Sequence, residues 1–267
     1  MASYFEARNL GKRLWIAACA TVVAAAVCLS APQSARAGGT RTVLELFTSQ
    51  GCSSCPPADA LLRSLAEDDG VLTLSYPVDY WDYLGWKDTL ASKANTQRQY
   101  GYAMQRGDRS VYTPQVVVNG RDHVVGSDRW AISRSIRSQE KSAGGAMAVD
   151  VDLIVTPETI KVRLDGSLTG DKSQKVRVWL VVFDEKETVP IGRGENRGKT
   201  ITYTNIVRDM ILLGNWTGKA ATLDIARKSL KIRKSKYDHC AVIVQREDHG
   251  NPGEILGVSA AEPITAF

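Results

Sequence analysis

The sequence predicts two domains: an α/β domain with a mixed sheet flanked by helices, followed by an all-β, sandwich-like domain. Three observations predict this fold class. In residues 41–142, strand-like runs alternate with helix-like runs. The stretch KSAGGAMA then interrupts the pattern with Gly144 and Gly145. Beyond it, strand-like segments follow one another, separated by turns rich in Gly, Asp and Pro. We therefore expect domains at residues 40–142 and 146–267.

In the first half, short apolar runs predict strands, and longer runs of mixed polarity predict helices. The dipeptide Asn119-Gly120 favours a tight hairpin between two short strands. The expected elements are, in order, strand TVLELF, helix DALLRSLAE, strand VLTLSYPVDYW, helix TLASKANTQRQYGYAMQRG, strands PQVVVNG and DHVVG, and helix SDRWAISRSIRSQ.

In the second half, alternating apolar and polar residues predict six strands. These are VDVDLIV, TIKVRLDGSL, KVRVWLVVF, TITYTNIVR, ATLDIAR and HCAVIVQ. The segment GRGENRGKTITYTNIVRD lacks phosphate-loop spacing, and we interpret it as a structural loop that leads into a strand.

The N-terminus resembles a secretory signal peptide. Arg8, Lys12 and Arg13 precede the apolar stretch LWIAACATVVAAAVCL, and Ala35 and Ala37 occupy the small positions of an A-x-A cleavage site. The apolar stretch is shorter than the roughly 20 residues of a membrane-spanning helix. We expect residues 1–37 to be removed, which leaves a periplasmic or secreted protein without stable membrane insertion.

The charge balance gives no reason to expect a nucleic-acid partner. Residues 1–37 hold four of the 34 Lys and Arg residues and one of the 29 Asp and Glu residues, so the mature chain has a net charge of +2. A nearly neutral protein lacks the electrostatic attraction to phosphates on which nucleic-acid binding depends.

Three of the five cysteines remain after cleavage, namely Cys52, Cys55 and Cys240. In an oxidising compartment we expect Cys52 and Cys55, two residues apart, to form a disulfide. We expect Cys240, which begins the run CAVIVQ, to fill a β core as a small hydrophobic residue.

The Cys52–Cys55 pair lies between the first expected strand and the first expected helix. The N-terminus of a helix favours thiolate over thiol, so a redox-active dithiol has a physical advantage there. We expect Cys52 to be the exposed nucleophile and Cys55 to resolve the mixed disulfide. Pro56 and Pro57 place the start of the helix near Pro57, with Cys55 just outside it.

The first half resembles the thioredoxin-like family. The resemblance rests on this C-x-x-C position and on VYTPQVVVNG, in which Pro114 precedes an apolar strand. It implies that Pro114 is cis and faces the dithiol, and that the backbone of Thr113 pairs with an extended substrate. It also suggests Glu45 as a relay of protons to the resolving cysteine, although Glu45 is displaced by one residue from the family's pattern. Gly51 departs from the family, because many thioredoxins have Trp there.

Over its mature length the chain is similar to the exported bacterial family known as domain of unknown function 1223. The matching stretches are LELFTSQGCSSCPPAD, VDYWDYLGWKD, VYTPQVVVNG and GENRGKTITYTNIVRDMILLGNWTG. The family name assigns no activity, so this similarity bears on fold and location.

We expect the chain to exchange disulfides with a protein or small-molecule thiol, with Cys52 and Cys55 as catalytic residues and Thr113 and Pro114 binding the substrate. Two alternatives stay open: a non-catalytic binding or scaffold module with a structural Cys52–Cys55 disulfide, and a copper carrier that uses the two thiolates. The spacing of the three histidines predicts no metal site, and no cofactor is expected. The aromatic residues of YPVDYWDYLGWKD either line a groove beside the dithiol or form a buried cluster between the domains, and we favour the buried cluster.

Overall fold

The computed structural model describes residues 41–143, 147–168, 175–230 and 239–261. The predicted signal peptide, residues 1–37, lies outside these residues, and so does the predicted link at residues 144–146. Within the described ranges, no helix has both the length and the apolar character needed to cross a bilayer.

The first half forms its strands and helices in the predicted order. Ser92 caps the second helix by accepting a hydrogen bond of 3.1 Å from the backbone N–H of Asn95. Asn119 and Gly120 both have positive φ angles, 49° and 68°, and form the predicted hairpin turn. The elements are β1 (Thr42–Thr48), α1 (Pro56–Leu65), β2 (Val71–Pro77), the 3-10 turn η1 (Asp82–Leu84), α2 (Lys93–Arg106), β3 (Gln115–Val118), β4 (Asp122–Val125) and α3 (Arg129–Ala143).

The second half consists of strands and one short 3-10 turn in the part of the chain that the structure describes. Two of its strands are long, with 16 residues in β7 and 17 in β8. The elements are β5 (Val149–Val155), β6 (Thr159–Gly166), β7 (Lys175–Pro190), β8 (Thr200–Trp216), β9 (Ala221–Ala226), the 3-10 turn η2 (Arg227–Ser229), β10 (His239–Asp248) and β11 (Asn251–Ala260).

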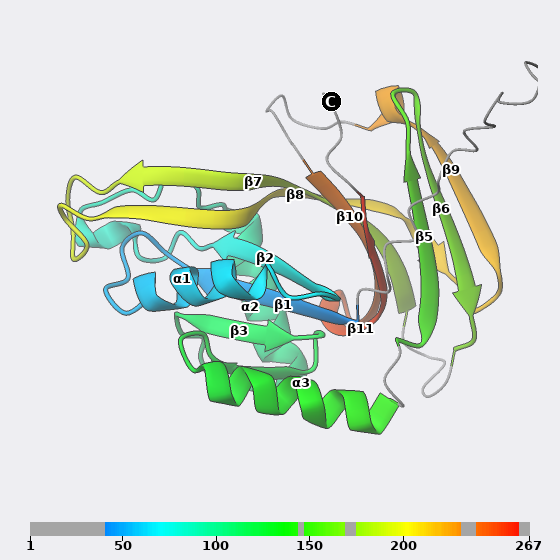
Figure 1. The fold of residues 1–267 in the computed structure, drawn as a ribbon, viewed down its shortest axis with the longest axis horizontal. Helices are drawn as coiled ribbons and strands as arrows, with labels where there is room; N and C mark the ends of the chain where they lie inside the picture. Colours follow the sequence, from blue (N-terminus) through cyan, green and yellow to red (C-terminus); the bar gives the residue numbers. More distant parts are fainter. Residues whose placement is uncertain (1–40, 144–146, 169–174, 231–238, 262–267) are drawn as a thin grey trace, which may run out of the picture. The chain divides into compact units, whose positions relative to one another are not determined.

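The predicted fold class is wrong. Instead of a thioredoxin-like α/β domain with its own sheet and a separate sandwich-like domain, one mixed sheet of eight strands combines both halves, in the order β11-β10-β7-β8-β2-β1-β3-β4 (Figure 1). A second sheet has the order β5-β6-β9. The described residues are mostly β, with three α-helices. The sheet is mixed because β1 pairs in parallel with β2 and antiparallel with β3.

The pairing of β2 with β8 joins the two halves. Ser75 is the register partner of Ile206 in a short parallel ladder. Next to it, the side-chain amide of Asn205 donates hydrogen bonds of 2.9 Å to the carbonyl oxygen of Thr73 and 3.1 Å to its hydroxyl oxygen. Asn205 has a positive φ of 51°, a conformation that asparagine tolerates better than most residues. This asparagine therefore holds the edge of β2 where regular backbone pairing is brief.

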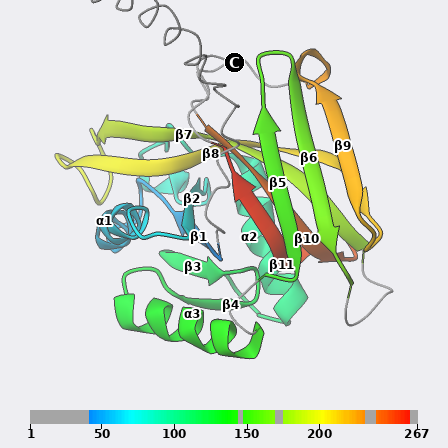
Figure 2. The same cartoon turned by 45° about the vertical axis from the view of Figure 1, so that its right-hand side comes forward.

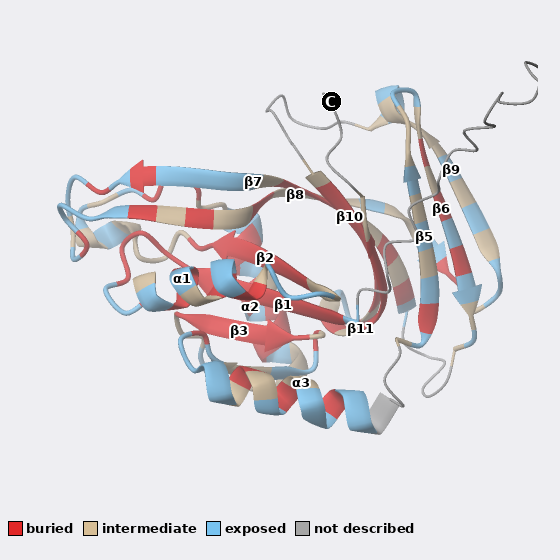
Figure 3. Cartoon of the chain, in the orientation of Figure 1, coloured by how far each residue is buried: buried red, intermediate tan, exposed pale blue. Residues whose placement is uncertain are grey.

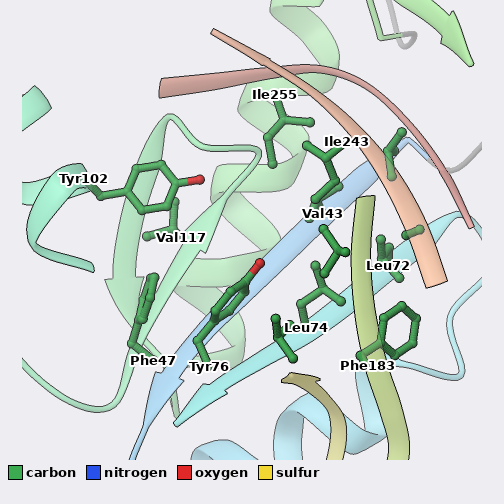
Figure 4. Close-up of a cluster of buried hydrophobic side chains, with 14 of the residues drawn as sticks. Val43, Phe47, Leu72, Leu74, Tyr76, Tyr102, Val117, Phe183, Ile243 and Ile255 are labelled. Atoms are coloured by element: carbon green, nitrogen blue, oxygen red, sulfur yellow. The ribbon is translucent and has the colours of Figure 1, made fainter. Parts of the chain in front are cut away.

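Helix α2 lies on the face of the central strands toward which β10 and β11 curl (Figures 1 and 2). Its Gly101 approaches β11 so closely that an added Cβ would lie 2.6 Å from Cδ of Pro252. The core on this face contains Phe47, Tyr76 and Tyr102 from the first half and Phe183 and Ile243 from the second (Figure 4). The two halves therefore share one hydrophobic core.

Helices α1 and α3 pack on the opposite face of the sheet. Ala58, Leu62 and Ile132 from these helices contact a core that includes Leu44 and Leu46 of β1. A further core fills the space between the β5-β6-β9 sheet and strands β7, β10 and β11. Strands β10 and β11 are buried along most of their length, and β7 is buried in its first half (Figure 3). Cys240 is fully buried in this core as a free cysteine, which confirms its predicted role.

Candidate functional site

Cys52 and Cys55 form a disulfide in the segment that connects β1 to α1. The backbone N–H of Cys52 donates to the carbonyl oxygen of Ser49, and the N–H of Cys55 to that of Cys52. Cys55 is the N-cap of α1, and Pro56 and Pro57 occupy the first turn, where a missing N–H costs no intrahelical hydrogen bond. The helix thus begins one residue earlier than expected, and Cys55 stands just outside it, as predicted.

Gly51 leaves room for an aromatic residue beside the dithiol. A Cβ at position 51 would lie 3.0 Å from Cβ of Trp81 and 3.3 Å from its carbonyl oxygen. The indole N–H of Trp81 in turn donates a hydrogen bond of 2.8 Å to Oγ1 of Thr113. Trp81 therefore connects the cysteine segment to the Thr113–Pro114 segment, and a large residue at position 51 would displace it.

The Thr113–Pro114 peptide bond is cis, as predicted. The expectations that Pro114 faces the dithiol and that Thr113 pairs with a substrate stay predictions. The carbonyl oxygen of Pro114 accepts a hydrogen bond of 2.9 Å from the N–H of Gly126. A Cβ on Gly126 would lie 3.1 Å from Cβ of Pro114 and 3.2 Å from Cβ of Ala58. Gly126 therefore lies between Pro114 and Ala58. Ala58 belongs to the first turn of α1 and follows Cys55 by three positions.

Both cysteines are buried, so the expectation that Cys52 is exposed is wrong. Cys52 is 2% exposed and Cys55 0%. The loop between β7 and β8, residues 191–199, covers the segment from the other half of the chain. Its Asn196, also 0% exposed, donates hydrogen bonds of 2.9 Å to the carbonyl oxygen of Gln50 and 2.8 Å to that of Cys52. We call residues 191–199 the cap loop.

Two more polar contacts complete the attachment of the cap loop. The carboxylate of Glu195 accepts a hydrogen bond of 3.2 Å from the N–H of Ser53. The ammonium group of Lys199 donates a hydrogen bond of 2.9 Å to Oδ1 of Asn196. The amide of Asn196 thus has partners for both its donor and its acceptor atoms.

The base of the cap loop packs on the segment between β2 and α2. Ile191 belongs to a buried cluster with Leu90 and Tyr203, against which Trp86 packs. Gly192 lies over the Trp86 ring, where an added Cβ would be 3.1 Å from Cζ3. Trp86 also donates a hydrogen bond of 2.8 Å to the side-chain oxygen of Gln50. The same tryptophan therefore supports both the cap loop and the residues before Cys52.

The aromatic residues after β2 divide between the two expected roles. Tyr76 is fully buried in the shared core, which agrees with the favoured interpretation. Trp81 and Tyr83 are stacked, with ring centroids 6.4 Å apart, and Tyr83 is 77% exposed. These two rings therefore form an aromatic surface beside Gly51 and Thr113.

Glu45 lies on the side of the sheet that faces α2. Its carboxylate is 2.8 Å from the guanidinium group of Arg98, and it also accepts a hydrogen bond from the hydroxyl group of Tyr102. Arg98 donates a further hydrogen bond of 3.0 Å to Gln245 of β10. The structure thus brings Glu45 into a buried network that joins β1, α2 and β10, rather than to Cys55.

Another buried carboxyl group, which the sequence analysis missed, lies on α1 one helical turn after Cys55. Asp59 of α1 is 3% exposed. Burial raises the pKa of Asp59 to about 8; the nearby hydroxyl of Thr48 opposes this increase, and the negative charge of Asp88 adds to it. Burial also raises the pKa of Tyr203 on β8, and the negative charges of Asp59 and Asp88 add to this increase. Asp59 follows Cys55 by four residues, a spacing that could have indicated a shared helix face.

No group of three or more His, Cys, Asp and Glu side chains within the described ranges converges in a way that could hold a metal ion. The candidate site consists of the Cys52–Cys55 disulfide, the Thr113–Pro114 segment, Trp81, Asn196 and Asp59.

The comparisons with known proteins assign the chain to a family. The family model described as "Protein of unknown function (DUF1223)" matches residues 43–245. A crystal structure of protein AGR_C_4864 from Agrobacterium tumefaciens is similar, with 36% sequence identity, a TM-score of 0.73, and coverage of 86% of this chain and 97% of that chain. HBP35 of Porphyromonas gingivalis is similar in fold alone, with 15% identity, a TM-score of 0.51, and coverage of 86% and 78%. No curated protein gives a significant match. Because the family model spans most of the sequence, the chain belongs to the DUF1223 family of proteins of unknown function.

Proposed function

We propose that the chain exchanges disulfides with a protein or small-molecule thiol, and that its Cys52–Cys55 pair cycles between disulfide and dithiol. The observation that carries this proposal is the position of the disulfide at the N-cap of α1, a helix whose first turn lies across Gly126 from Pro114. A helix N-terminus stabilises a thiolate that forms there, which lowers the barrier to opening the disulfide.

The oxidised pair accepts two electrons from a substrate that carries two thiols. One substrate thiolate attacks the sulfur of Cys52, forms a mixed disulfide and breaks the Cys52–Cys55 bond, so that Cys55 leaves as a thiolate. The second substrate thiolate then attacks the substrate sulfur of the mixed disulfide and releases Cys52 as a thiolate. The substrate leaves as a disulfide and the pair is reduced; the reverse sequence reduces a substrate disulfide.

Cys52 is 2% exposed and the cap loop is bonded to its carbonyl oxygen, so we expect a substrate to reach Cys52 only when this loop moves. The contacts that hold the loop to residues 50–53 are three hydrogen bonds, two from Asn196 and one to Glu195. Each such bond contributes about 0.5–1.5 kcal/mol, which thermal motion or an approaching substrate can overcome. The proposal includes a periplasmic or secreted location, because disulfides persist in oxidising compartments.

Trapping of a mixed disulfide tests this proposal. The reduced Cys55→Ser variant should accumulate a glutathione adduct on Cys52 when treated with glutathione disulfide, because the resolving thiol is absent. The reduced wild-type protein should instead regain its disulfide, and Cys52→Ser should react slowly. Equal adduct formation by both variants, or by neither, would remove the catalytic assignment.

The burial of both cysteines favours one other function, a binding or scaffold module stapled by a permanent disulfide. The reduction potential separates the two functions, since structural disulfides typically lie below about −300 mV.

A further inference from the structure

A pocket lies on the face of the sheet that α2 covers, apart from the candidate site. It has a volume of about 310 Å³ and is bounded by α2, by the middle of β8 and by the turn between β10 and β11. None of the candidate-site residues belongs to its lining. Its volume is at the lower end of the range that is typical of small-molecule sites.

An irregularity in β8 shapes one wall of this pocket. The register between β7 and β8 shifts between Val182 and Phe183, so that Arg208 is an extra residue without a register partner on β7. Such a bulge changes the direction of nearby side chains and is frequent next to functional sites. The four consecutive residues 207–210 accordingly all line the pocket, whereas a regular strand presents only alternate residues to one side.

Four charged side chains of the described residues line the pocket, and three of them form ion pairs with residues outside it. These pairs are Arg98 with Glu45 at 2.8 Å, Arg208 with Asp184 at 2.7 Å, and Glu247 with Arg177 at 2.6 Å. Each pair is neutral as a whole, so the three pairs add no net charge to the pocket. The N-terminus of α2, which also borders the pocket, is capped by Ser92.

Asp209 is the fourth charged side chain, and it has no ion-pair partner among the described residues. It is half-buried, and its Oδ1 accepts a hydrogen bond of 2.9 Å from the backbone N–H of Met210, the next residue. No described residue donates a hydrogen bond to its Oδ2. The carboxylate of Asp209 therefore gives the pocket a negative charge that the surrounding described residues do not compensate.

Trp179 gives the same pocket an aromatic ring that a cation could use. Its indole N–H donates a hydrogen bond of 3.1 Å to Glu247, which holds the ring in place. Within the described ranges no lysine or arginine lies over this ring, whereas Arg98 already lies over Tyr76, 5.5 Å from the ring centroid. Aromatic rings attract cations, and tryptophan attracts them most strongly. The ring and the carboxylate thus favour the same kind of ligand.

We propose that this pocket binds a small organic cation, in which an ammonium or guanidinium group is attached to an apolar body. The cationic group pairs with Asp209, and the body packs against Trp179 and Met210. Leu212, the register partner of Trp179, is three residues from Asp209 on β8, a rise of about 10 Å, so a ligand with one ring and a short chain can contact both. An anion would meet the carboxylate of Asp209 without an unpaired side-chain cation to offset it.

Three probes that differ in charge test this proposal. They are 2-phenylethylamine, its neutral analogue 2-phenylethanol and its anionic analogue 3-phenylpropionate. Binding to the native protein at neutral pH is followed by the ¹H–¹⁵N resonance of the Trp179 indole, which is assigned from its absence in Trp179→Phe. The amine should shift this resonance saturably and bind about tenfold or more tightly than the alcohol, because a hydrogen bond to a charged group is stronger than one to a neutral group. The carboxylate should bind more weakly than the alcohol.

A substitution of Asp209 isolates the role of its charge. Asp209→Asn keeps the shape of the side chain and removes the charge, so the affinity for the amine should fall about tenfold or more, to that for the alcohol. Its affinity for the alcohol should stay as in the wild type. Asp150→Asn, which changes an exposed acid on β5 outside the pocket, is the matched control and should bind the amine as the wild type does.

Four outcomes would overturn the proposal, and none of them bears on disulfide exchange. They are an amine that does not shift the Trp179 resonance, equal affinities for the three probes, tightest binding of the carboxylate, and an Asp209→Asn variant that still prefers the amine. If Asp209→Asn does not fold, the order of the three affinities for the wild type decides. Added salt should then weaken the binding of the amine and leave that of the alcohol unchanged, and equal effects on both probes would also contradict the proposal.

Discussion

The side-chain amide of Asn196 donates a hydrogen bond of 2.8 Å to the carbonyl oxygen of Cys52, a residue 144 positions earlier in the chain. Through this contact the cap loop is attached to the segment of the first half of the chain that holds the disulfide. The long strands β7 and β8 are what carry the loop there, since they belong to the same sheet as β1 and β2. The two halves therefore build the site together.

Removal of the Asn196 side chain should open the site. Asn196→Ala loses two hydrogen bonds to residues 50–52, each worth about 0.5–1.5 kcal/mol, so the loop should open about 10-fold more often. We expect the second-order rate of reduction by dithiothreitol to rise by a similar factor. Arg197→Ala, which removes an exposed side chain from the same loop, is the control. A rate for Asn196→Ala no higher than that of this control would mean that the cap loop does not limit access.

A methyl group at position 126 should separate Pro114 from α1. In Gly126→Ala the new Cβ would lie 2.8 Å from Cδ1 of Leu46 and 3.1 Å from Cβ of Pro114, which is too close. We expect the free energy of unfolding to fall by about 1–3 kcal/mol and disulfide exchange to slow. Gly214→Ala on β8, with no atom within 4 Å of the new Cβ, should show neither effect. Urea unfolding measures the difference, and equal stabilities of the two variants would contradict the close contact.

The stability of the protein should depend on the ionisation of Asp59. Its pKa is 3.8 in an ordinary environment and about 8 in the folded chain, so between these values the folded state binds more protons than the unfolded state. The stability that protonation contributes is therefore complete below about pH 4 and is lost as the pH rises through 8, by at most about 1.4 kcal/mol per pH unit. Asp59→Asn cannot ionise at this position. The free energy of unfolding of the variant minus that of the wild type should therefore increase from pH 5 to 8. A constant difference across this range would show that Asp59 ionises as easily in the folded protein as in the unfolded one.

Glu45 should matter for stability and not for proton transfer. Glu45→Gln leaves the guanidinium group of Arg98 without its carboxylate beside Tyr102, in a buried position. Removing one partner of a buried ion pair costs about 3–5 kcal/mol. We expect urea unfolding to show such a loss, while the pH profile of reduction by dithiothreitol stays as in the wild type. An altered pH profile at unchanged stability would instead restore Glu45 as the proton relay.

Local sequence patterns predicted the order of the helices and strands in the first half, because each of these elements depends on residues that are neighbours in the sequence. Asn119-Gly120 specifies a tight turn wherever two strands flank it. The spacing of Cys52 and Cys55 was sufficient to predict their disulfide. The apolar run after Cys240 was sufficient to predict that this cysteine is buried. The predicted export, location and domain boundaries stay predictions.

The pairing of strands could not be predicted in the same way. Ser75 and Ile206 are 131 residues apart, and nothing in either strand's own pattern names the other as its partner. The same distance in sequence explains why the burial of Cys52 and the role of Asn196 were missed. The segment GENRGK looked like a loop, which it is, but only the shared sheet brings it over the dithiol.

An equilibrium redox titration of the Cys52–Cys55 pair tests the central claim most directly. The protein used is a folded variant in which the buried Cys240 is replaced by serine. It is equilibrated in dithiothreitol buffers of defined potential, free thiols are alkylated, and the reduced fraction is measured by mass spectrometry. We predict a reversible two-electron transition of the folded protein with a midpoint above about −300 mV. A pair that stays oxidised at lower potentials, and is reduced only when the protein unfolds, would contradict it.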